Sequence, residues 1–224
     1  MFWPANTDTC RVTSIAIFAK APLHGYAKTR LVPTLGAAGA ARLQREMTLR
    51  ALQVAHDAGI GDVTLWCAPD AKQRFFRALM KSQANTQGLG FRQQVDGDLG
   101  ERMAASFANT QGAMLLIGTD CPVLHPTHLQ QAAKALAEGD DAVFIPAEDG
   151  GYVLVGLARP IPEIFREIAW GSAQVMAQTR ERLTQLNLQW CELETLWDVD
   201  LPSDVMRWRE MQRVETASAA RTDE

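Results

Sequence analysis

The stretch GAMLLIGTDCP, residues 112–122, is a short apolar run bounded by a glycine and a proline. Such a run, without polar alternation, is typical of a strand that is buried on both faces of a parallel sheet. VTSIAIFA, residues 12–19, has the same character near the start of the chain. Between and beyond these runs, apolar residues recur at steps of three and four, the period of a helix face. The alternation predicts an α/β fold, a three-layer α/β/α sandwich with a mostly parallel central sheet.

The same patterns divide the chain into elements. Helices are expected over residues 39–58, 71–82, 100–109, 172–186 and 200–211, and over a further stretch from Leu129 to Leu136. The remaining strands are expected over residues 62–69, 90–95 and 188–194, with two more inside 141–157. Because no linker or repeat interrupts these elements, residues 11–213 are expected to form a single domain, with 1–10 and 214–224 as flexible termini.

The composition excludes several classes of protein. A chain of 224 residues with 47% hydrophobic composition can bury a core without disulfides, and its formal net charge of −4 argues against a nucleic-acid partner. The four cysteines are far apart and form no C-x-x-C pair, which argues against zinc and favours a reduced, cytoplasmic protein. We find neither a signal peptide nor an apolar run of the ~20 residues that a membrane helix needs, so no membrane partner is expected.

A basic segment, FAKAPLHGYAKTRL at residues 18–31, follows the first expected strand. It carries Lys20, Lys28 and Arg30, and Gly25 allows backbone N–H groups to approach a ligand closely. Because Lys28 and Arg30 are two apart, an extended segment would point both side chains the same way. The segment lacks the glycine spacing of a P-loop. We interpret it as a grip for phosphate or pyrophosphate; the alternative is a solvated surface loop whose cations pair with nearby carboxylates.

Two acidic motifs follow later strands. Asp120 lies just past the apolar run of residues 112–122, and Asp198 and Asp200 form a DVD motif after the last expected strand. A hard cation such as Mg²⁺ takes one or two carboxylates together with phosphate oxygens, so Asp120 and Asp200 are candidate ligands. The alternatives are a turn at Asp120 and a helix N-cap at Asp200. The metal interpretation requires Asp120 and Asp200 to meet in space.

Three further features border the expected strand ends. In AEDGGYVLVG, residues 147–156, Asp149 precedes a glycine pair that allows close approach to a bulky ligand, or that forms a tight hairpin turn. Trp170 precedes a helix, where it can pack on the core or stack on a ligand ring. In GDLGERM, residues 97–103, Asp98 and Arg102 are candidates for binding a nucleotide, with a helix cap as the alternative.

Six motifs in this order resemble a known family. They are FAKAPLHGYAKTRL, GDLGERM, IGTDCPVL, PAEDGGYVLVGL, WGSAQVMAQTRERL and DVDLPSD. Together they resemble the bacterial glycosyltransferase-like or nucleotide-diphospho-sugar transferase-like proteins of the Rossmann-like GT-A fold. That family is related to phospholactate and molybdenum-cofactor guanylyltransferases. The resemblance covers about Ile15 to Asp204.

The resemblance implies roles for these residues. It implies that Lys20, Lys28 and Arg30 grip the phosphates of a nucleotide. It also implies that Asp120 and Asp200 hold Mg²⁺ or Mn²⁺. Residues of the glycine-pair turn would border the pocket for the sugar or acceptor; they are Asp149, Gly150 and Gly151. The glycine-rich first loop of the molybdenum-cofactor enzymes is absent, so the choice of nucleotide cannot be transferred.

We therefore expect a Mg²⁺-dependent transferase that transfers a sugar from a nucleotide-sugar donor to a small-molecule acceptor. Lys28, Arg30 and Asp120 would act in catalysis by offsetting charge on the departing group. One alternative is a nucleotidyltransferase that releases pyrophosphate from a nucleoside triphosphate. An alternative of another class is a non-catalytic nucleotide-binding protein. The sequence does not predict an oligomeric state.

Overall fold

The chain forms a seven-stranded sheet in the computed structural model, which describes residues 13–82 and 88–222. The strand order is β3-β2-β1-β4-β6-β5-β7; β6 is antiparallel to both of its neighbours and every other pairing is parallel. The expected mostly parallel sheet is confirmed. Its strands are β1 (Ser14–Lys20), β2 (Val63–Ala68), β3 (Leu89–Gln93), β4 (Met114–Ile117), β5 (Ala142–Pro146), β6 (Tyr152–Leu157) and β7 (Trp190–Glu192).

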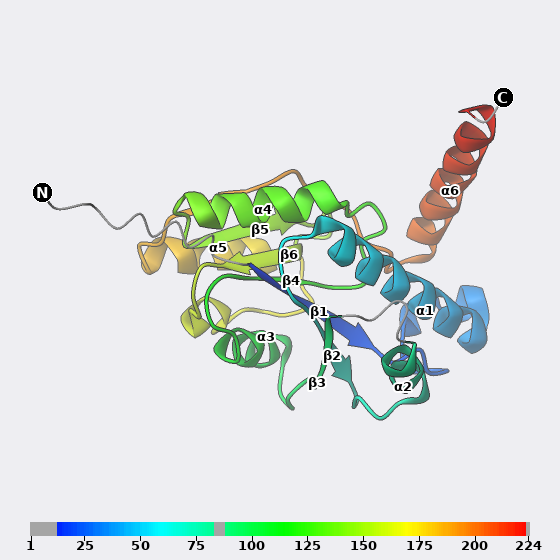
Figure 1. Ribbon diagram of the computed structural model, residues 1–224, viewed down its shortest axis with the longest axis horizontal. Helices are drawn as coiled ribbons and strands as arrows, with labels where there is room; N and C mark the ends of the chain where they lie inside the picture. Colours follow the sequence, from blue (N-terminus) through cyan, green and yellow to red (C-terminus); the bar gives the residue numbers. More distant parts are fainter. Residues whose placement is uncertain (1–12, 83–87, 223–224) are drawn as a thin grey trace, which may run out of the picture.

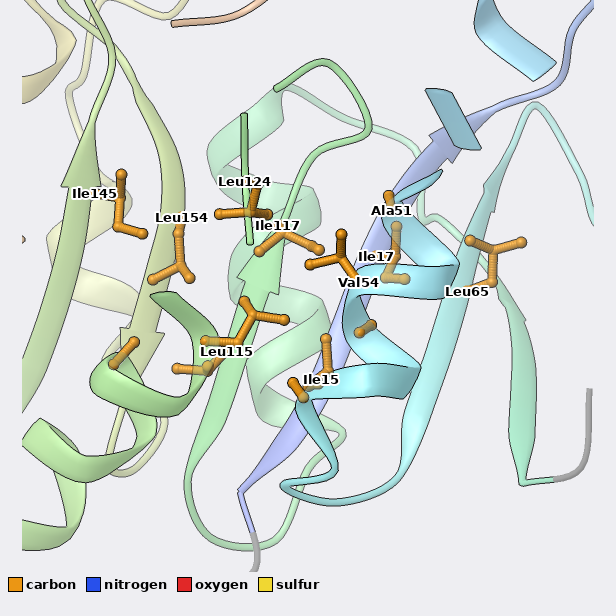
Figure 2. Packing of buried hydrophobic residues seen from close by; sticks show 14 of the residues in the cluster. Ile15, Ile17, Ala51, Val54, Leu65, Leu115, Ile117, Leu124, Ile145 and Leu154 are labelled. Carbon is orange, nitrogen blue, oxygen red and sulfur yellow. The ribbon is translucent and has the colours of Figure 1, made fainter. Parts of the chain in front are cut away.

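Helices cover both faces of the sheet, which confirms the three-layer architecture (Figure 1). One face is packed by α1 (Val32–Ala58), α2 (Arg74–Lys81) and α4 (Pro126–Glu138), and the other by α3 (Leu99–Ala108), the 3₁₀ turn η3 (Pro162–Phe165) and α5 (Val175–Gln185). The sequence of β4 is apolar throughout because both faces of the strand are buried in hydrophobic clusters. Leu115 and Ile117 belong to the cluster on the first face, and the other two residues belong to the cluster on the second face. Figure 2 shows Leu115 and Ile117 in the first cluster, which also holds Val54 of α1.

Three boundaries differ from the sequence-based expectation. Helix α1 begins at Val32, and a kink at Gly36, with φ 68° and ψ 162°, separates its first turn from the expected stretch. Helix α5 begins at Val175 instead of residue 172, with Ser172 Oγ accepting a hydrogen bond from the N–H of Gln174 at 3.2 Å. Helix α6 (Pro202–Thr222) continues past residue 213, where the sequence predicted a flexible tail; residues 1–10 lie outside the described part.

A third hydrophobic cluster fixes the start of α6. Trp197 and Val199 are buried there with Val205 and Trp208 of α6 and with residues of α1. This cluster holds the chain between β7 and α6 against the carboxyl edge of the sheet, whereas the far end of α6 projects away from the body (Figure 1). Among the residues that the structure describes, no helix is long and apolar enough to cross a membrane.

Candidate active site

Three carboxylates meet at the carboxyl edge of the sheet. Asp120 follows β4, Asp149 lies in the turn between β5 and β6, and Asp198 follows β7. All three line one cavity of about 270 Å³, together with Tyr152 and Trp170. Open sheets of this type bind ligands beyond the carboxyl ends of their strands, where loops from neighbouring strands converge. The topology therefore brings side chains that are far apart in sequence into one site.

Asp120 forms a buried ion pair with the basic segment. Lys28 Nζ lies 2.8 Å from Asp120 Oδ1 and also donates to the carbonyl oxygen of Val199 at 2.5 Å. The Lys28 side chain is only 3% exposed, while that of Asp120 is 44% exposed. An ammonium group has three donors, so Lys28 retains one for a further acceptor. The contacts tie the segments after β1, β4 and β7 together.

The backbone at Lys28 differs from the extended form that the sequence analysis assumed. Lys28 has φ 52° and ψ 44°, the left-handed conformation, and it precedes the 3₁₀ turn η1 (Thr29–Leu31). A residue with a side chain adopts this conformation at a cost, and such strained residues occur often at functional sites. Despite the left-handed turn, both cations contact the segment that follows β7. Lys28 Nζ donates to the carbonyl of Val199, and Arg30 Nη1 pairs with Asp200 Oδ2.

The two carboxylates of the DVD motif have different environments. Trp197 and Val199 are buried in the third hydrophobic cluster, and Asp198, between them, lines the cavity. Asp200 does not line the cavity and pairs with Arg30. The helix-cap alternative for Asp200 also finds no support, because its carboxylate accepts from no N–H of the described part of α6; the carboxylate of Asp204 instead accepts from the N–H groups of Asp200 and Leu201, just before the helix.

Burial and neighbouring charges raise the pKa of Asp198 to about 6. The largest cause is burial, followed by repulsion from Asp149, Asp120 and Asp200, while Lys28 acts in the opposite direction. A raised pKa means that the ionised form is disfavoured in this position. The site therefore concentrates negative charge that its own cation does not fully offset.

The glycine pair is held by the protein's own backbone. A side chain at Gly150, which has φ 90°, would place its Cβ 2.1 Å from the carbonyl oxygen of Ala173. The carbonyl of Gly150 accepts from Met176 N at 2.8 Å, and Asp149 Oδ1 accepts from Gly151 N at 2.9 Å. Gly150 thus serves the packing of the hairpin against the start of α5, and this packing fixes Asp149 at the cavity.

An aromatic wall faces these carboxylates. Tyr152 and Trp170 meet edge to face, with ring centroids 6.4 Å apart. A Cβ at Gly100 of α3 would lie 2.8 Å from Trp170 Nε1, so the helix approaches the indole closely. Burial raises the pKa of the Tyr152 hydroxyl well above its usual range, so it stays protonated. Trp170 both packs on the second cluster and lines the cavity, which joins the two roles considered for it.

The remaining candidate residues lie outside this cavity. Asp98 caps α3 by accepting from Glu101 N at 2.9 Å, and Arg102 Nε donates to the carbonyl of Gly97 at 2.9 Å. These contacts match the capping alternative. Lys20 is exposed at the end of β1, and Gly25 lies in the turn that follows, with φ 73°. A role of these four residues in nucleotide binding stays a prediction.

A larger cavity, of about 320 Å³, lies elsewhere. It is lined by residues at the starts of β1, β2 and β4, including Ser14, Thr64 and Met114. That is the amino edge of the parallel strands, opposite the edge at which folds of this type bind ligands. We therefore place the candidate active site at the smaller cavity, where the carboxylates converge.

The donor set, which consists of carboxylates, suits a hard divalent cation such as Mg²⁺ or Mn²⁺ better than a metal that prefers thiolate or imidazole ligands. Within residues 13–82 and 88–222, no group of three or more His, Cys, Asp or Glu side chains is arranged to hold a metal ion alone. Asp120 and Asp198 nevertheless share the cavity and the repulsion described above. Mg²⁺ is usually held by one or two carboxylates plus substrate phosphates, so the residues fit a cation that completes its shell with a ligand.

Sequence reasoning selected Asp120 and Asp149 but missed Asp198 and Tyr152 as cavity residues. Asp198 was visible in the DVD motif, but each carboxylate of that motif lies between two apolar residues, so the sequence does not separate Asp198 from Asp200. Residues that alternate along an extended segment face opposite sides. The apolar neighbours of each carboxylate therefore indicate only that its side chain points away from the core.

Comparison with solved structures gives the same fold. A candidate nucleotide-diphospho-sugar transferase from Desulfovibrio desulfuricans G20 is 30% identical, with 85% of this chain and 83% of that chain covered and a TM-score of 0.74. A nucleotidyl transfer enzyme from Methanothermobacter is 15% identical over 89% of this chain and 97% of that one, with a TM-score of 0.56. CMP:2-keto-3-deoxy-manno-octonic acid synthetase, in complex with CTP, is 14% identical over 91% and 99%, with a TM-score of 0.55. No curated protein matches the chain.

Together with the 30% identity to the Desulfovibrio protein, the fold and the site define an enzyme of the transferase class. Residues 51–172 match the family described as "Uncharacterized protein conserved in bacteria (DUF2064)". The chain belongs to that family, and the resemblance to nucleotide-diphospho-sugar transferase-like proteins is confirmed.

Proposed function

We propose that the protein transfers a sugar from a nucleotide-sugar donor to a small acceptor with a hydroxyl group, with the help of Mg²⁺ or Mn²⁺. The observation that carries this proposal is the lining of the cavity: carboxylates from three loops, an aromatic wall, and no Lys, Arg or His among the described lining residues. Carboxylates accept hydrogen bonds from hydroxyl groups, and aromatic faces cover the apolar faces of ligand rings.

The same lining disfavours an acceptor that ends in a phosphate. Nucleotidyl transfer of the cofactor guanylyltransferase type joins a nucleotide to such an anionic acceptor. Recognition of a phosphate relies on Arg or Lys, or on backbone N–H groups at a helix start. A cavity that already raises the pKa of Asp198 by charge repulsion would repel a further anion. The cavity therefore favours sugar transfer over nucleotidyl transfer.

In this proposal, Asp120 and Asp198 hold the cation, in place of the pair of Asp120 and Asp200 that the sequence suggested. The bound cation would neutralise charge on the diphosphate of the donor. Lys28 keeps Asp120 in place and offers its third donor to a phosphate oxygen. Arg30 is exposed and can exchange Asp200 for a phosphate.

The acceptor side of the site is assigned to Asp149 and Trp170. Both line the cavity, and the packing of Gly150 against Ala173 holds Asp149 in a fixed turn. The donor nucleotide would lie toward the basic segment, on the other side of Asp120. We keep the cytoplasmic location as a prediction, on the basis of the wide spacing of the cysteines and of the three that the structure describes, which are free.

A ligand screen tests the proposal. Nucleotide-sugars and nucleoside triphosphates are each added with Mn²⁺ or with a chelator, and the melting temperature is measured. A ligand at 100 times its Kd stabilises the native state by about 2.7 kcal/mol. We expect stabilisation by a nucleotide-sugar that depends on the cation. Binding that is independent of the cation and survives Asp120→Ala would support a non-catalytic nucleotide-binding protein instead.

A product assay then separates the two reactions. The proposal predicts release of a nucleoside diphosphate and transfer of the sugar to a hydroxyl acceptor. Asp149→Asn should lower turnover, whereas Glu148→Gln, in the same turn but paired with Arg207 outside the cavity, should not. Release of pyrophosphate from a triphosphate, without turnover of any nucleotide-sugar, would establish nucleotidyl transfer.

A further inference from the structure

A chain of buried hydrogen bonds runs from helix α1 to Asp120. Gln44 Nε2 donates to Thr119 Oγ1 at 3.0 Å and to Thr48 Oγ1 at 3.2 Å. Thr119 Oγ1 in turn donates to Asp120 Oδ1 at 3.1 Å. Gln44 is 2% exposed, Thr48 0% and Thr119 6%, so these groups are shielded from water.

The direction of this chain is fixed by its partners. Thr48 Oγ1 donates its own hydrogen to the carbonyl of Gln44, so it can only accept from the amide group of that residue. Thr119 likewise accepts from Gln44 and has its hydroxyl hydrogen left for Asp120. Both N–H donors of the Gln44 amide are therefore committed, and the amide cannot rotate without breaking two buried hydrogen bonds.

As a consequence, the two oxygens of the Asp120 carboxylate have different hydrogen bonds. Asp120 Oδ1 receives Lys28 Nζ at 2.8 Å and Thr119 Oγ1 at 3.1 Å. Asp120 Oδ2 accepts no hydrogen bond from the residues that the structure describes. A carboxylate that is held through one oxygen presents the other in a defined direction, as ligands of metal sites usually do when an outer partner orients them.

We propose that Gln44 and Thr119 are positioning residues, which orient Asp120 so that Oδ2 faces the divalent cation. This inference rests on the proposed function, because it assigns a purpose to the free oxygen of a residue that we consider a cation ligand. It adds residues of α1 and of the β4 loop that are not among the residues lining the cavity and carry no charge. The hydroxyl of Thr119 is the last link, so its removal should have the largest effect.

Binding of Mn²⁺ to the whole chain, alone and with a nucleoside diphosphate that supplies phosphate oxygens, tests this proposal without any turnover. The number and affinity of bound ions are measured by electron paramagnetic resonance on the wild type and on Thr119→Val, Thr119→Ser and Gln44→Met. Loss of an outer partner typically weakens metal binding 10–100-fold. We expect a loss in this range for Thr119→Val, a smaller loss for Gln44→Met, and a return toward the wild-type affinity for Thr119→Ser, which keeps the hydroxyl.

A matched control separates positioning from stability. Thr179 is also a buried threonine, 1% exposed, and its hydroxyl donates to the carbonyl of Val175 within α5. Thr179→Val removes a comparable hydroxyl without touching Asp120, and its Mn²⁺ affinity should equal that of the wild type. Denaturant unfolding of every variant shows whether affinity follows the free energy of unfolding or the contact with Asp120.

The two ideas fail in different ways. If the wild type binds Mn²⁺ and Thr119→Val binds it equally well, the positioning role is overturned and the proposed function stands. If Thr179→Val loses as much affinity as Thr119→Val, the effect belongs to general stability and the positioning role is again overturned. If the wild type binds no Mn²⁺ even with the nucleoside diphosphate present, both the cation-dependent function and the positioning role are overturned.

Discussion

The two sides of the carboxyl edge carry opposite charges, and they differ in whether those charges are paired. On the β1 side, the cations Lys28 and Arg30 are both paired with carboxylates. On the side of β5, β6 and β7, Asp149 and Asp198 form no ion pair with any residue in the described part of the chain, although they lie at the same cavity. The difference shows that the cations of this site are already paired with carboxylates, whereas two carboxylates of the site have no paired cation among the described residues.

The two cations also differ from each other. The side chain of Lys28 is 3% exposed and that of Arg30 is 64% exposed. A buried ion pair is costly to break, while an exposed pair contributes at most about 1 kcal/mol. We conclude that Lys28 is a fixed part of the site and that Arg30 is free to change partners. An additional cation is then what the site needs to hold a diphosphate.

The largest expected effect comes from breaking the link between the two sides. Asp120→Asn removes the charge that pairs with Lys28 and the proposed cation ligand. We expect turnover to fall by about 10³-fold, the upper range for loss of one electrostatic contact in a site. Because the buried ammonium group loses its counter-ion while Asp120 itself is 44% exposed and screened by water, we also expect the free energy of unfolding to fall by about 1–3 kcal/mol. Steady-state kinetics and denaturant unfolding measure the two effects.

A double variant keeps these two effects apart. Lys28→Met combined with Asp120→Asn removes both members of the pair, so the double variant should be more stable than the sum of the single changes predicts, by about 0.5–3 kcal/mol. Its turnover should stay as low as that of Asp120→Asn alone. Recovery of turnover together with stability would show that Asp120 has only a structural role.

The next effect sharpens the comparison within the DVD motif. Asp198→Asn should weaken Mn²⁺ binding about 10–100-fold, as expected when a group that binds or orients the cation is lost. Asp200→Asn removes only the exposed pair with Arg30, so Mn²⁺ binding should change little and stability by less than about 1 kcal/mol. The opposite ranking would support the pair of Asp120 and Asp200 that the sequence suggested.

Local patterns were sufficient to predict the layers of the fold. The helix face expected from steps of three and four includes Leu43, Met47 and Val54, and all three are buried. The uninterrupted apolar run of β4 is explained by a sheet that is covered on both faces. These features depend on side-chain periodicity within one element, which a single sequence displays directly.

The details of the site depend on contacts between elements, which a single sequence does not display. The DVD motif presents two equivalent carboxylates, but Arg30 reaches one of them and the cavity contains the other. The chain of Gln44 and Thr119 joins a helix and a loop whose residues are 75 positions apart. Thr119 belongs to the motif IGTDCPVL but carries no charge, and Gln44 lies in no quoted motif, so only the folded structure relates Gln44 to Asp120.

The smallest expected effect is the pH dependence of the free energy of unfolding that Asp198 causes. The pKa of Asp198 is about 6 in the folded protein, against 3.8 for an ordinary aspartate. Between these pH values the native state binds more protons than the unfolded state, so the contribution of Asp198 to the free energy of unfolding falls as pH rises. Each pH unit corresponds to 1.36 kcal/mol at most, and solvent screening reduces the total to about 1–2 kcal/mol.

Asp198→Asn removes this unfavourable charge, so the metal-free variant should be more stable than the wild type by about 1–2 kcal/mol above pH 6. The difference should vanish near pH 4, where Asp198 is protonated in the folded wild type. Denaturant unfolding of both proteins at pH 4, 5 and 7, with a chelator present, measures it. A constant difference across this range would mean that the charge of Asp198 is already offset, and the excess of negative charge that we infer for this side of the site would then be absent.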